Sequence, residues 1–231
     1  MKYSFISARE CIKMNRIFLV LKLDYCIIKT SYSKVIMVYF ISIMLGLLTQ
    51  PIMPIIIIMF FSVSFSGLTF SIIEKNNCEK LYGILPVRRR EIITGRYLYG
   101  FISGIINLII SIVLAYIISI LSKQRIDTFT LSLSITLAFC YYSFAVSISY
   151  PIYYKIGFSK SFIFITMPLY ILILLFVFLS EKTNLDEFIE KALQYFSNQH
   201  ILFLFFGFIF SMFMLIISAF ISYGIFKNSE L

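Results

Sequence analysis

The sequence predicts an all-α, polytopic membrane protein with six transmembrane helices, an N-terminal interfacial helix and an amphipathic outer helix between spans five and six. Hydrophobic residues make up 60% of the 231 residues and charged residues only 13%. That leaves too little polar surface for a water-soluble domain of this length. Because apolar segments run almost from end to end, we expect a single transmembrane domain over residues 1–231.

The spans are predicted from uncharged stretches, since about 20 apolar residues cross the ~30 Å hydrocarbon core as a helix. These stretches cover 35–73, 97–121, 128–154, 161–180 and 201–226. The first is too long for one crossing, and Thr49-Gln50-Pro51 interrupts it. Proline lacks an amide donor and disfavours helix at the residue before it. We therefore expect a hairpin with a short arm at about 32–48 and a full arm at about 52–73.

Orientation follows from the basic residues. With the N-terminus inside, 16 of the 20 Lys and Arg fall in the inner segments 1–34, 74–96, 155–160 and 227–231. An excess of Lys and Arg marks the cytoplasmic side, so both termini are expected in the cytoplasm. This asymmetry also accounts for the net charge of +9. No basic patch interleaved with aromatic residues lies on a soluble face, so no nucleic-acid partner is expected.

The N-terminal segment 1–30 is interpreted as a leader followed by an interfacial helix. Ile17, Leu21, Tyr25 and Ile28 recur at helical spacing among charged residues, which is typical of a helix lying on the membrane surface and contacting lipid. The alternative is a frayed polar leader before the first span.

The outer loop 181–200 contains a second amphipathic pattern. Over 184–196 the apolar residues share one helical face, and Asn184 with Glu187 forms a capping-box pattern. We expect a short helix on the outer surface, with a plain connector as the alternative.

Catalytic and cofactor motifs are missing from the sequence. It has no G-x-x-x-x-G-K-[ST] phosphate loop, so the chain is not expected to bind ATP itself. His200 is the only histidine, and the four cysteines lack metal-ligand or redox spacing. No ionisable residue lies deep within a predicted span, which weakens the hypothesis of an ion-coupled transporter. No catalytic residue, metal or cofactor is predicted.

The inner segment 74–96, between spans two and three, is the most charged cytoplasmic element. Proline is tolerated in the first turn of a helix, so Pro86 is expected to end one short helix and to open another that runs into span three. Such a rigid protrusion would pass force between a soluble partner and the membrane, although an ordinary topology-fixing loop is the alternative. The candidate coupling residues are Glu74, Lys75, Glu79, Leu85, Pro86, Arg88, Arg89, Arg90 and Glu91.

Three parts of this segment carry a resemblance to a known family. They are Glu74-Lys75, Leu85-Pro86-Val87-Arg88-Arg89-Arg90-Glu91-Ile92 and Arg96-Tyr97-Leu98. This run resembles the signature of ABC-2-type permeases, whose six spans, cytoplasmic termini and two accessory helices also fit the predicted layout. Arg89 departs from the family, which often has Ser or Thr there.

The resemblance implies a function. Such permeases form homodimers or heterodimers in the bacterial cytoplasmic membrane, and each associates with a separate ATP-binding subunit that pushes on the coupling segment. It implies export of a peptide, antimicrobial or other hydrophobic compound. The alternative is a non-transporting membrane protein that assembles or regulates a partner complex, and a secondary transporter ranks third.

Two further groups of residues concern packing and cargo. Small residues lie within ~60° of one another on span three and are typical of close helix contacts, either between protomers or within one: Gly100, Gly104, Ser111 and Ala115. On span four, Tyr142, Ser143 and Ser147 suit an amphipathic cargo, or simply helix packing.

Overall fold

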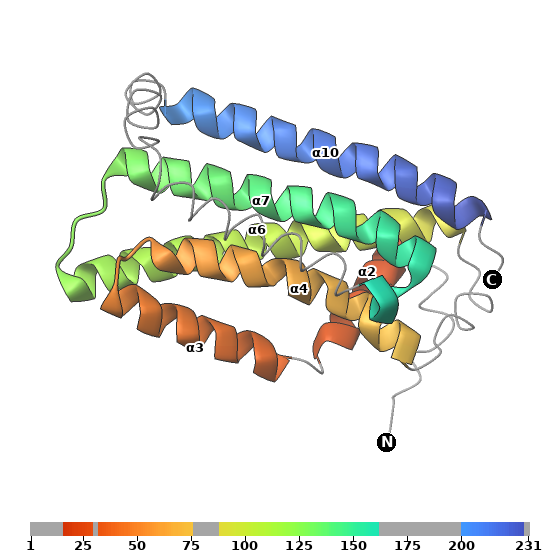
Figure 1. The fold of residues 1–231 in the computed structure, drawn as a ribbon, viewed down its shortest axis with the longest axis horizontal. Coiled ribbons are helices and arrows are strands. Elements are labelled where there is room, and N and C mark those ends of the chain that lie inside the picture. The colour runs from red at the N-terminus through yellow and green to blue at the C-terminus, as the bar shows by residue number, and fades with distance from the viewer. Residues whose placement is uncertain (1–15, 30–31, 76–87, 162–199, 229–231) are drawn as a thin grey trace.

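The structure, a computed structural model, describes residues 16–29, 32–75, 88–161 and 200–228. No strand occurs in these ranges. The helices are, in chain order, α2 (Arg16–Lys29), α3 (Tyr32–Leu48), α4 (Met53–Lys75), α6 (Arg89–Ser122), α7 (Thr128–Ile156) and α10 (His200–Asn228). All except α2 lie roughly side by side in one bundle (Figure 1).

Within the described ranges, four helices are long and apolar enough to cross a membrane: α4, α6, α7 and Leu204–Lys227 of α10. The pair Val20–Lys29 and Ser33–Leu48, bent by 69°, raises this number to five if it is counted as one span. The all-α class is therefore confirmed, but the prediction of six spans is confirmed only for these four or five. The predicted fifth span, apart from its first residue, and the outer amphipathic helix lie outside the described residues.

The predicted hairpin is present between α3 and α4. Helix α3 ends at Leu48 and α4 begins at Met53, as the proline interruption predicts. The Met53 N–H donates to the Gln50 carbonyl at 3.0 Å and closes the turn. A Cβ added at Gly46 would lie 2.9 Å from Pro54 Cγ, so glycine permits the close approach of the two arms.

Helices α7 and α10 pack together along their length and run in the same direction (Figure 1). The Cys140 thiol, near the middle of α7, lies 3.5 Å from the carbonyl of Gly207, which is in the first half of α10. Further along, the Ser218 hydroxyl donates to the Ser147 carbonyl at 2.6 Å. These contacts advance in step along both helices, so the pair is parallel.

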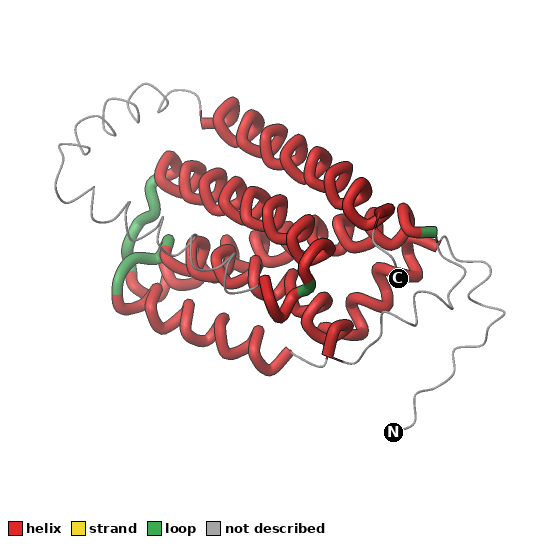
Figure 2. Tube along the Cα trace, turned by 45° about the vertical axis from the view of Figure 1, so that its right-hand side comes forward, coloured by secondary structure: helices red, strands yellow, loops and turns green. Residues whose placement is uncertain are grey.

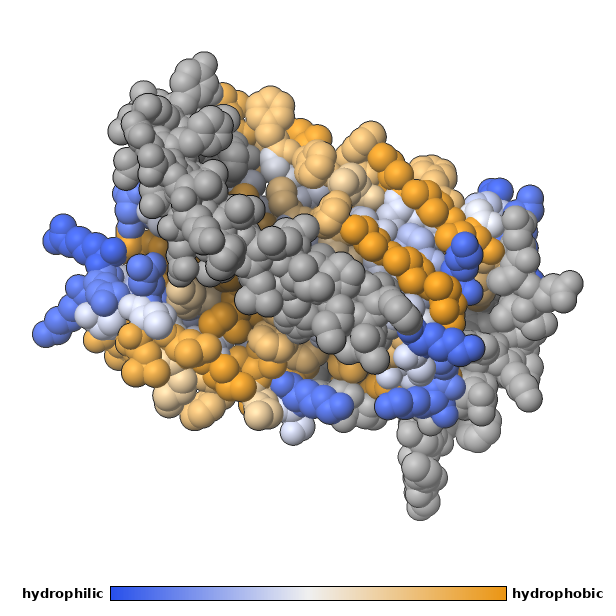
Figure 3. All heavy atoms as spheres, viewed as in Figure 1, coloured by the Kyte–Doolittle hydropathy of each residue, from blue (hydrophilic) through white to orange (hydrophobic). Residues whose placement is uncertain are grey.

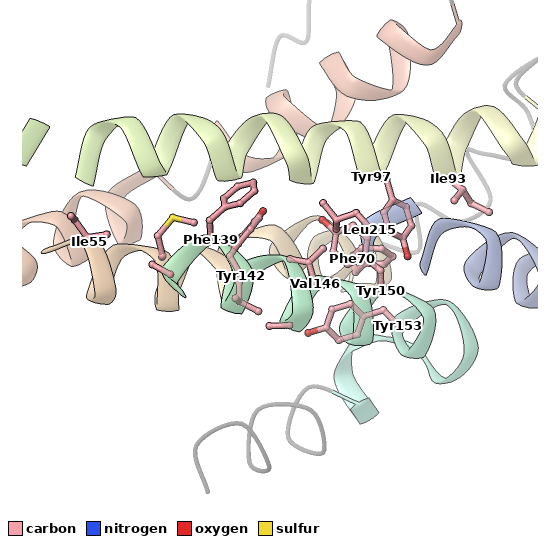
Figure 4. Packing of buried hydrophobic residues seen from close by; sticks show 14 of the residues in the cluster. Ile55, Phe70, Ile93, Tyr97, Phe139, Tyr142, Val146, Tyr150, Tyr153 and Leu215 are labelled. Carbon is pink, nitrogen blue, oxygen red and sulfur yellow. The ribbon is translucent and has the colours of Figure 1, made fainter. Parts of the chain in front are cut away.

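The core lies between α4, α6, α7 and α10 and is rich in aromatic rings (Figure 4). The Phe70 ring centroid lies 5.1 Å from that of Tyr150 and 5.3 Å from that of Tyr153, within the range of favourable ring contacts. Buried tyrosine hydroxyls require hydrogen-bond partners. The aromatic core therefore also carries the polar contacts that connect the helices.

The surface shown in Figure 3 is apolar in the middle of the bundle and hydrophilic toward its two ends. One end carries the α6–α7 turn, with Lys123 and Arg125 exposed. At the other end α6 begins and α4, α7 and α10 finish (Figure 1); we call this the basic end. Helix α2 lies there, turned away from α3 (Figure 2), and packs mainly against α6.

The stretch predicted as an interfacial helix is helical, and one row of its residues is buried within the protein. Val20, Asp24 and Ile28 are at most 5% exposed, whereas Tyr25 is 49% exposed. The row of residues four apart packs on the side of α2 that meets α6 and α4, and Tyr25 lies outside that row. The position of α2 relative to the membrane stays a prediction, as does the division of the chain into one domain.

Candidate functional site

The start of α6 is fixed by a local hydrogen bond. Arg88 is extended, and its backbone N–H donates to the Glu91 side-chain Oε2 at 2.8 Å, as in one half of a capping box. The Glu91 carboxylate also places a negative charge in the first turn, where the helix dipole favours it. The predicted coupling segment therefore continues directly into the 34-residue helix α6.

Arg89 and Arg90 both contact the last turns of α10. The Arg89 Nη1 donates to the Phe226 carbonyl at 3.1 Å and to the Lys227 carbonyl at 3.0 Å, and its guanidinium carbon lies 5.7 Å from the Phe226 ring centroid. The Arg90 guanidinium lies 4.7 Å above the Tyr223 ring. Carbonyls at a helix C-terminus lack intrahelical donors and attract cations. The two arginines therefore join the base of α6 to the end of α10.

The remaining predicted coupling residues differ in their placement. Arg88 and Lys75 have exposed side chains at the basic end, where a soluble partner would reach them. Glu79, Leu85 and Pro86 lie outside the described residues, so their predicted roles stay predictions.

Glu74 joins the end of α4 to the end of α7. Its Oε2 accepts the backbone N–H of Phe158 at 2.7 Å and that of Ser159 at 3.0 Å. A carboxylate in this position satisfies the free amides of the helical turn that begins at Phe158. Gly157 permits this geometry because its φ is +87° and its Cα faces the carboxylate. Glu74 thus acts as a fixed link between two helices of the bundle.

Arg96 lies within α6, two turns beyond its start, and is only 6% exposed. Its guanidinium lies 4.4 Å from the ring centroid of Phe70 on α4 and 5.5 Å from that of Tyr154 on α7. Aromatic faces attract a desolvated cation. The motif residue Arg96 is therefore a buried contact among three helices and is not part of the exposed segment.

Asp24 on α2 is the functional candidate that sequence reasoning missed. It is 0% exposed, and neither of its side-chain oxygens is hydrogen-bonded within the part of the chain that the structure describes. A signal was available, because Asp24 stands four residues from both Val20 and Ile28 on the apolar side of an amphipathic helix. A carboxylate in such a row is expected either to face a cation or to stay neutral.

Tyr97 adds a second polar link between α6 and α10. Its hydroxyl lies 2.6 Å from the Ser218 hydroxyl and 2.7 Å from the Ser222 hydroxyl. All three side chains are buried. The first turns of α6 are therefore tied to α10 both at the surface, through Arg89, and in the core.

The small-residue face of α6 packs within the chain. All four members are buried: Gly100, Gly104, Ser111 and Ala115. The Tyr142 hydroxyl of α7 donates to the Gly100 carbonyl at 2.6 Å, and a Cβ added at Gly104 would lie 3.0 Å from Tyr142 Cζ. Glycine therefore makes room for the α7 tyrosine. A role of this face between protomers stays a prediction.

The predicted cargo residues of α7 also take part in packing. Tyr142 is bonded to α6, and the Ser147 carbonyl accepts the Ser218 hydroxyl of α10. Ser143 is buried. Among the described residues, no group of three or more His, Cys, Asp or Glu could hold a metal ion. The candidate site is thus a group of hydrogen bonds and cation–π contacts that connect the ends of the helices.

Comparison with known families agrees with this arrangement. Residues 19–227 match the model of the ABC-2 family transporter proteins. The chain belongs to that family. Its members are membrane components of transporters and are not themselves catalytic, and they generally partner with an ATP-binding subunit. No curated protein sequence matches the chain, and no solved structure does.

Within this ABC-2 membrane protein, the family match contains every described coupling residue. Five motif residues join helices, and Arg88 and Lys75 are exposed. The five are Glu74, Arg89, Arg90, Arg96 and Tyr97. A contact of Glu79, Arg88, Arg89, Arg90 and Glu91 with an ATP-binding subunit stays a prediction.

Proposed function

We propose that this ABC-2 protein is the permease subunit of an ABC exporter and that a separate ATP-binding subunit docks on its basic end. The permease would form the translocation path together with a second copy of itself or with a different permease. Nucleotide-driven movement of the ATP-binding subunit would then displace the base of α6.

The observation that carries the proposal is the linkage at the basic end. Arg89, Arg90 and Tyr97 tie α6 to α10, while Arg96 contacts rings from α4 and α7. Glu74 ties α4 to the end of α7. A push on the start of α6 would therefore reach four helices, which is what coupling by a soluble motor requires.

The membrane, orientation and cargo belong to the same proposal. We place the chain in the bacterial cytoplasmic membrane with both ends inside, because the basic end holds most of the described Lys and Arg residues. The parallel direction of α7 and α10 fits one further crossing between them. The cargo in this proposal is a peptide, an antimicrobial or another hydrophobic compound, as the resemblance to ABC-2-type permeases implies.

The experiment is an affinity pull-down from detergent-solubilised native membranes, with a tag placed after Leu231. A P-loop ATPase recovered in near-stoichiometric amount supports the proposal. Recovery of other membrane proteins without an ATPase, when a known exporter keeps its own under the same conditions, would favour an assembly or regulatory role.

Charge reversal tests the docking surface. Reversing Arg88, Arg89 and Arg90 together would also break the contacts with α10. Arg88→Glu alone changes an exposed side chain, so it should lower ATPase recovery and substrate-stimulated ATPase activity without affecting membrane insertion. Unchanged ATPase recovery and unchanged substrate-stimulated ATPase activity in this variant would show that Arg88 does not contact the ATP-binding subunit.

A further inference from the structure

Helix α7 has a gap in its backbone hydrogen bonding at Pro151. Proline has no amide hydrogen, so the carbonyl four residues earlier, that of Ser147, has no α-helical donor. Pro151 is buried, and α7 nevertheless continues to Ile156. Inside a membrane a backbone carbonyl without a donor is unfavourable, and proline is tolerated there where a neighbouring side chain bonds the freed carbonyl.

Helix α10 supplies the missing donor. The Ser218 hydroxyl donates to the Ser147 carbonyl at 2.6 Å, and Ser218 is only 3% exposed. This hydroxyl therefore takes the place of the absent amide of Pro151. Ser211, two turns earlier on α10 and also buried, instead donates to the Gly207 carbonyl of its own helix at 2.8 Å, as serines within helices commonly do.

A directed chain of hydroxyls connects this donor to α6. Because Ser218 gives its single hydrogen to the Ser147 carbonyl, it must accept in its 2.6 Å contact with the Tyr97 hydroxyl. Tyr97 thus donates to Ser218, and Ser222 donates to Tyr97 at 2.7 Å. Each hydroxyl in such a chain polarises the next. The donor at the proline gap is therefore oriented by a residue of α6, the helix that begins at the basic end.

The turn of α7 that follows Pro151 belongs to the contacts at the basic end. The Tyr154 ring centroid lies 5.2 Å from that of Phe226 on α10. Just beyond the helix, the Phe158 amide is bonded to Glu74 of α4 at 2.7 Å. A proline is a usual place for a helix to bend. The gap therefore separates a turn that is tied to the ends of α4 and α10 from the long part of α7 within the bundle.

We propose that Pro151 is a hinge in α7 and that the hydroxyl of Ser218, oriented by Tyr97, holds this hinge closed. While the bond is made, the last turn of α7 stays aligned with the rest of the helix. Movement of α6 relative to α10 separates Tyr97 from Ser218, weakens the bond to the Ser147 carbonyl and frees the last turn to bend. The hinge stands on the packing of this chain, whereas its operation by nucleotide-driven movement of α6 rests on the proposed function.

The test is hydrogen–deuterium exchange of the full chain in lipid nanodiscs, measured by mass spectrometry on the α7 amides of residues 152–156. Ser218→Ala leaves the Ser147 carbonyl without a donor, so exchange there should become about tenfold faster. Pro151→Ala restores the amide of α7 itself, so in that background Ser218→Ala should change exchange by less than about twofold. The matched control Ser211→Ala loses a hydroxyl bonded within α10 and should leave exchange within about twofold of wild type.

Tyr97→Phe tests the connection of the hinge to α6. This variant keeps the ring but leaves Ser218 without its donor, so exchange of residues 152–156 should become about threefold faster. The effect should disappear in the Ser218→Ala background, because Tyr97 acts on the gap through Ser218. A purely structural role of the Tyr97 hydroxyl would persist in that background.

The outcomes separate the hinge from its alternatives. Unchanged exchange in Ser218→Ala, or an equal effect of Ser218→Ala with and without Pro151, would overturn the hinge. An effect of Tyr97→Phe that persists without Ser218 would overturn the connection to α6. If Ser218→Ala does not fold, folded protein recovered from the double variant with Pro151→Ala supports the hinge, and loss of both overturns it. None of these measurements involves an ATP-binding subunit, so failure of the proposed function would show separately, as wild-type chain that recovers no ATPase in the pull-down.

Discussion

The bond between Arg89 and the end of α10 gives the sharpest prediction. Arg89→Gln removes a charged donor from the Phe226 and Lys227 carbonyls, at 3.1 and 3.0 Å, and a guanidinium from the Phe226 ring. A hydrogen bond from a charged group contributes about 1.5–3 kcal/mol, a cation at a helix C-terminus about 0.3–1 kcal/mol and an exposed cation–π contact about 0.5–1 kcal/mol. These contributions overlap, and one of the two bonds is exposed. We therefore expect the free energy of opening the last turns of α10 to fall by about 2 kcal/mol.

The assay is amide exchange of the last two turns of α10. A loss of about 2 kcal/mol raises the local opening equilibrium about 30-fold, since about 1.4 kcal/mol is a factor of ten. Arg89→Lys keeps the charge near the carbonyls but loses the planar fork, so we expect about a fivefold increase, midway on this scale. Thermal unfolding of the whole chain should change less than this local measurement, because fraying of one helix end is a partial opening.

The matched control is Arg88→Gln, which removes the same charge from the neighbouring, exposed position. It should leave α10 exchange within about twofold, because surface substitutions away from specific contacts change stability by at most about 0.5 kcal/mol. Equal exchange rates in the Arg88 and Arg89 variants would show that the effect comes from net charge and not from the contact of Arg89 with the end of α10.

The remaining predictions concern other links between helices. Gly104→Ala should lower the free energy of unfolding by about 1–3 kcal/mol, because its Cβ would overlap the Tyr142 ring, as an overpacked core does. Gly224→Ala, which meets nothing within 4 Å, should not destabilise the chain, so equal thermal shifts in detergent would contradict this packing. Tyr97→Phe should cost about 1–2 kcal/mol, because it leaves the two α10 serines without its hydroxyl; an unchanged unfolding temperature would contradict that role. Glu74→Gln removes the negative charge of the group that accepts two backbone N–H bonds. Amide exchange of the turn after α7 should become about tenfold faster, which corresponds to a fall of about 1.4 kcal/mol in the free energy of local opening. Unchanged amide exchange at that turn would show that Glu74 does not connect α4 to the end of α7.

Local features of the fold were predictable from the sequence. Thr49-Gln50-Pro51 placed the α3–α4 turn correctly because proline acts on its own backbone and its neighbour. Spans two, three, four and six were confirmed because uncharged length determines which helices can cross a membrane. The helix expected to open at Pro86 and to run into span three is present as α6, which begins at Arg89.

Long-range partners were not predictable in the same way. The spacing of Gly100 and Gly104 indicated a close contact but not that the Tyr142 ring fills it. Arg89 was read as a partner contact, because nothing near it in sequence signals carbonyls 137 and 138 residues away. Asp24 was overlooked because it was counted as one of the charges of a polar leader. Its spacing of four from two buried residues was the available signal.

Docking of an ATP-binding subunit on the basic end is detected by site-specific photo-cross-linking. A benzophenone amino acid replaces Arg88 at the basic end or Lys123 at the opposite end, both exposed, in complexes purified from native membranes. Docking on the basic end predicts a cross-link from position 88 to a P-loop ATPase and none from position 123. A cross-link from position 123 but not from position 88, with the complex intact, would contradict it.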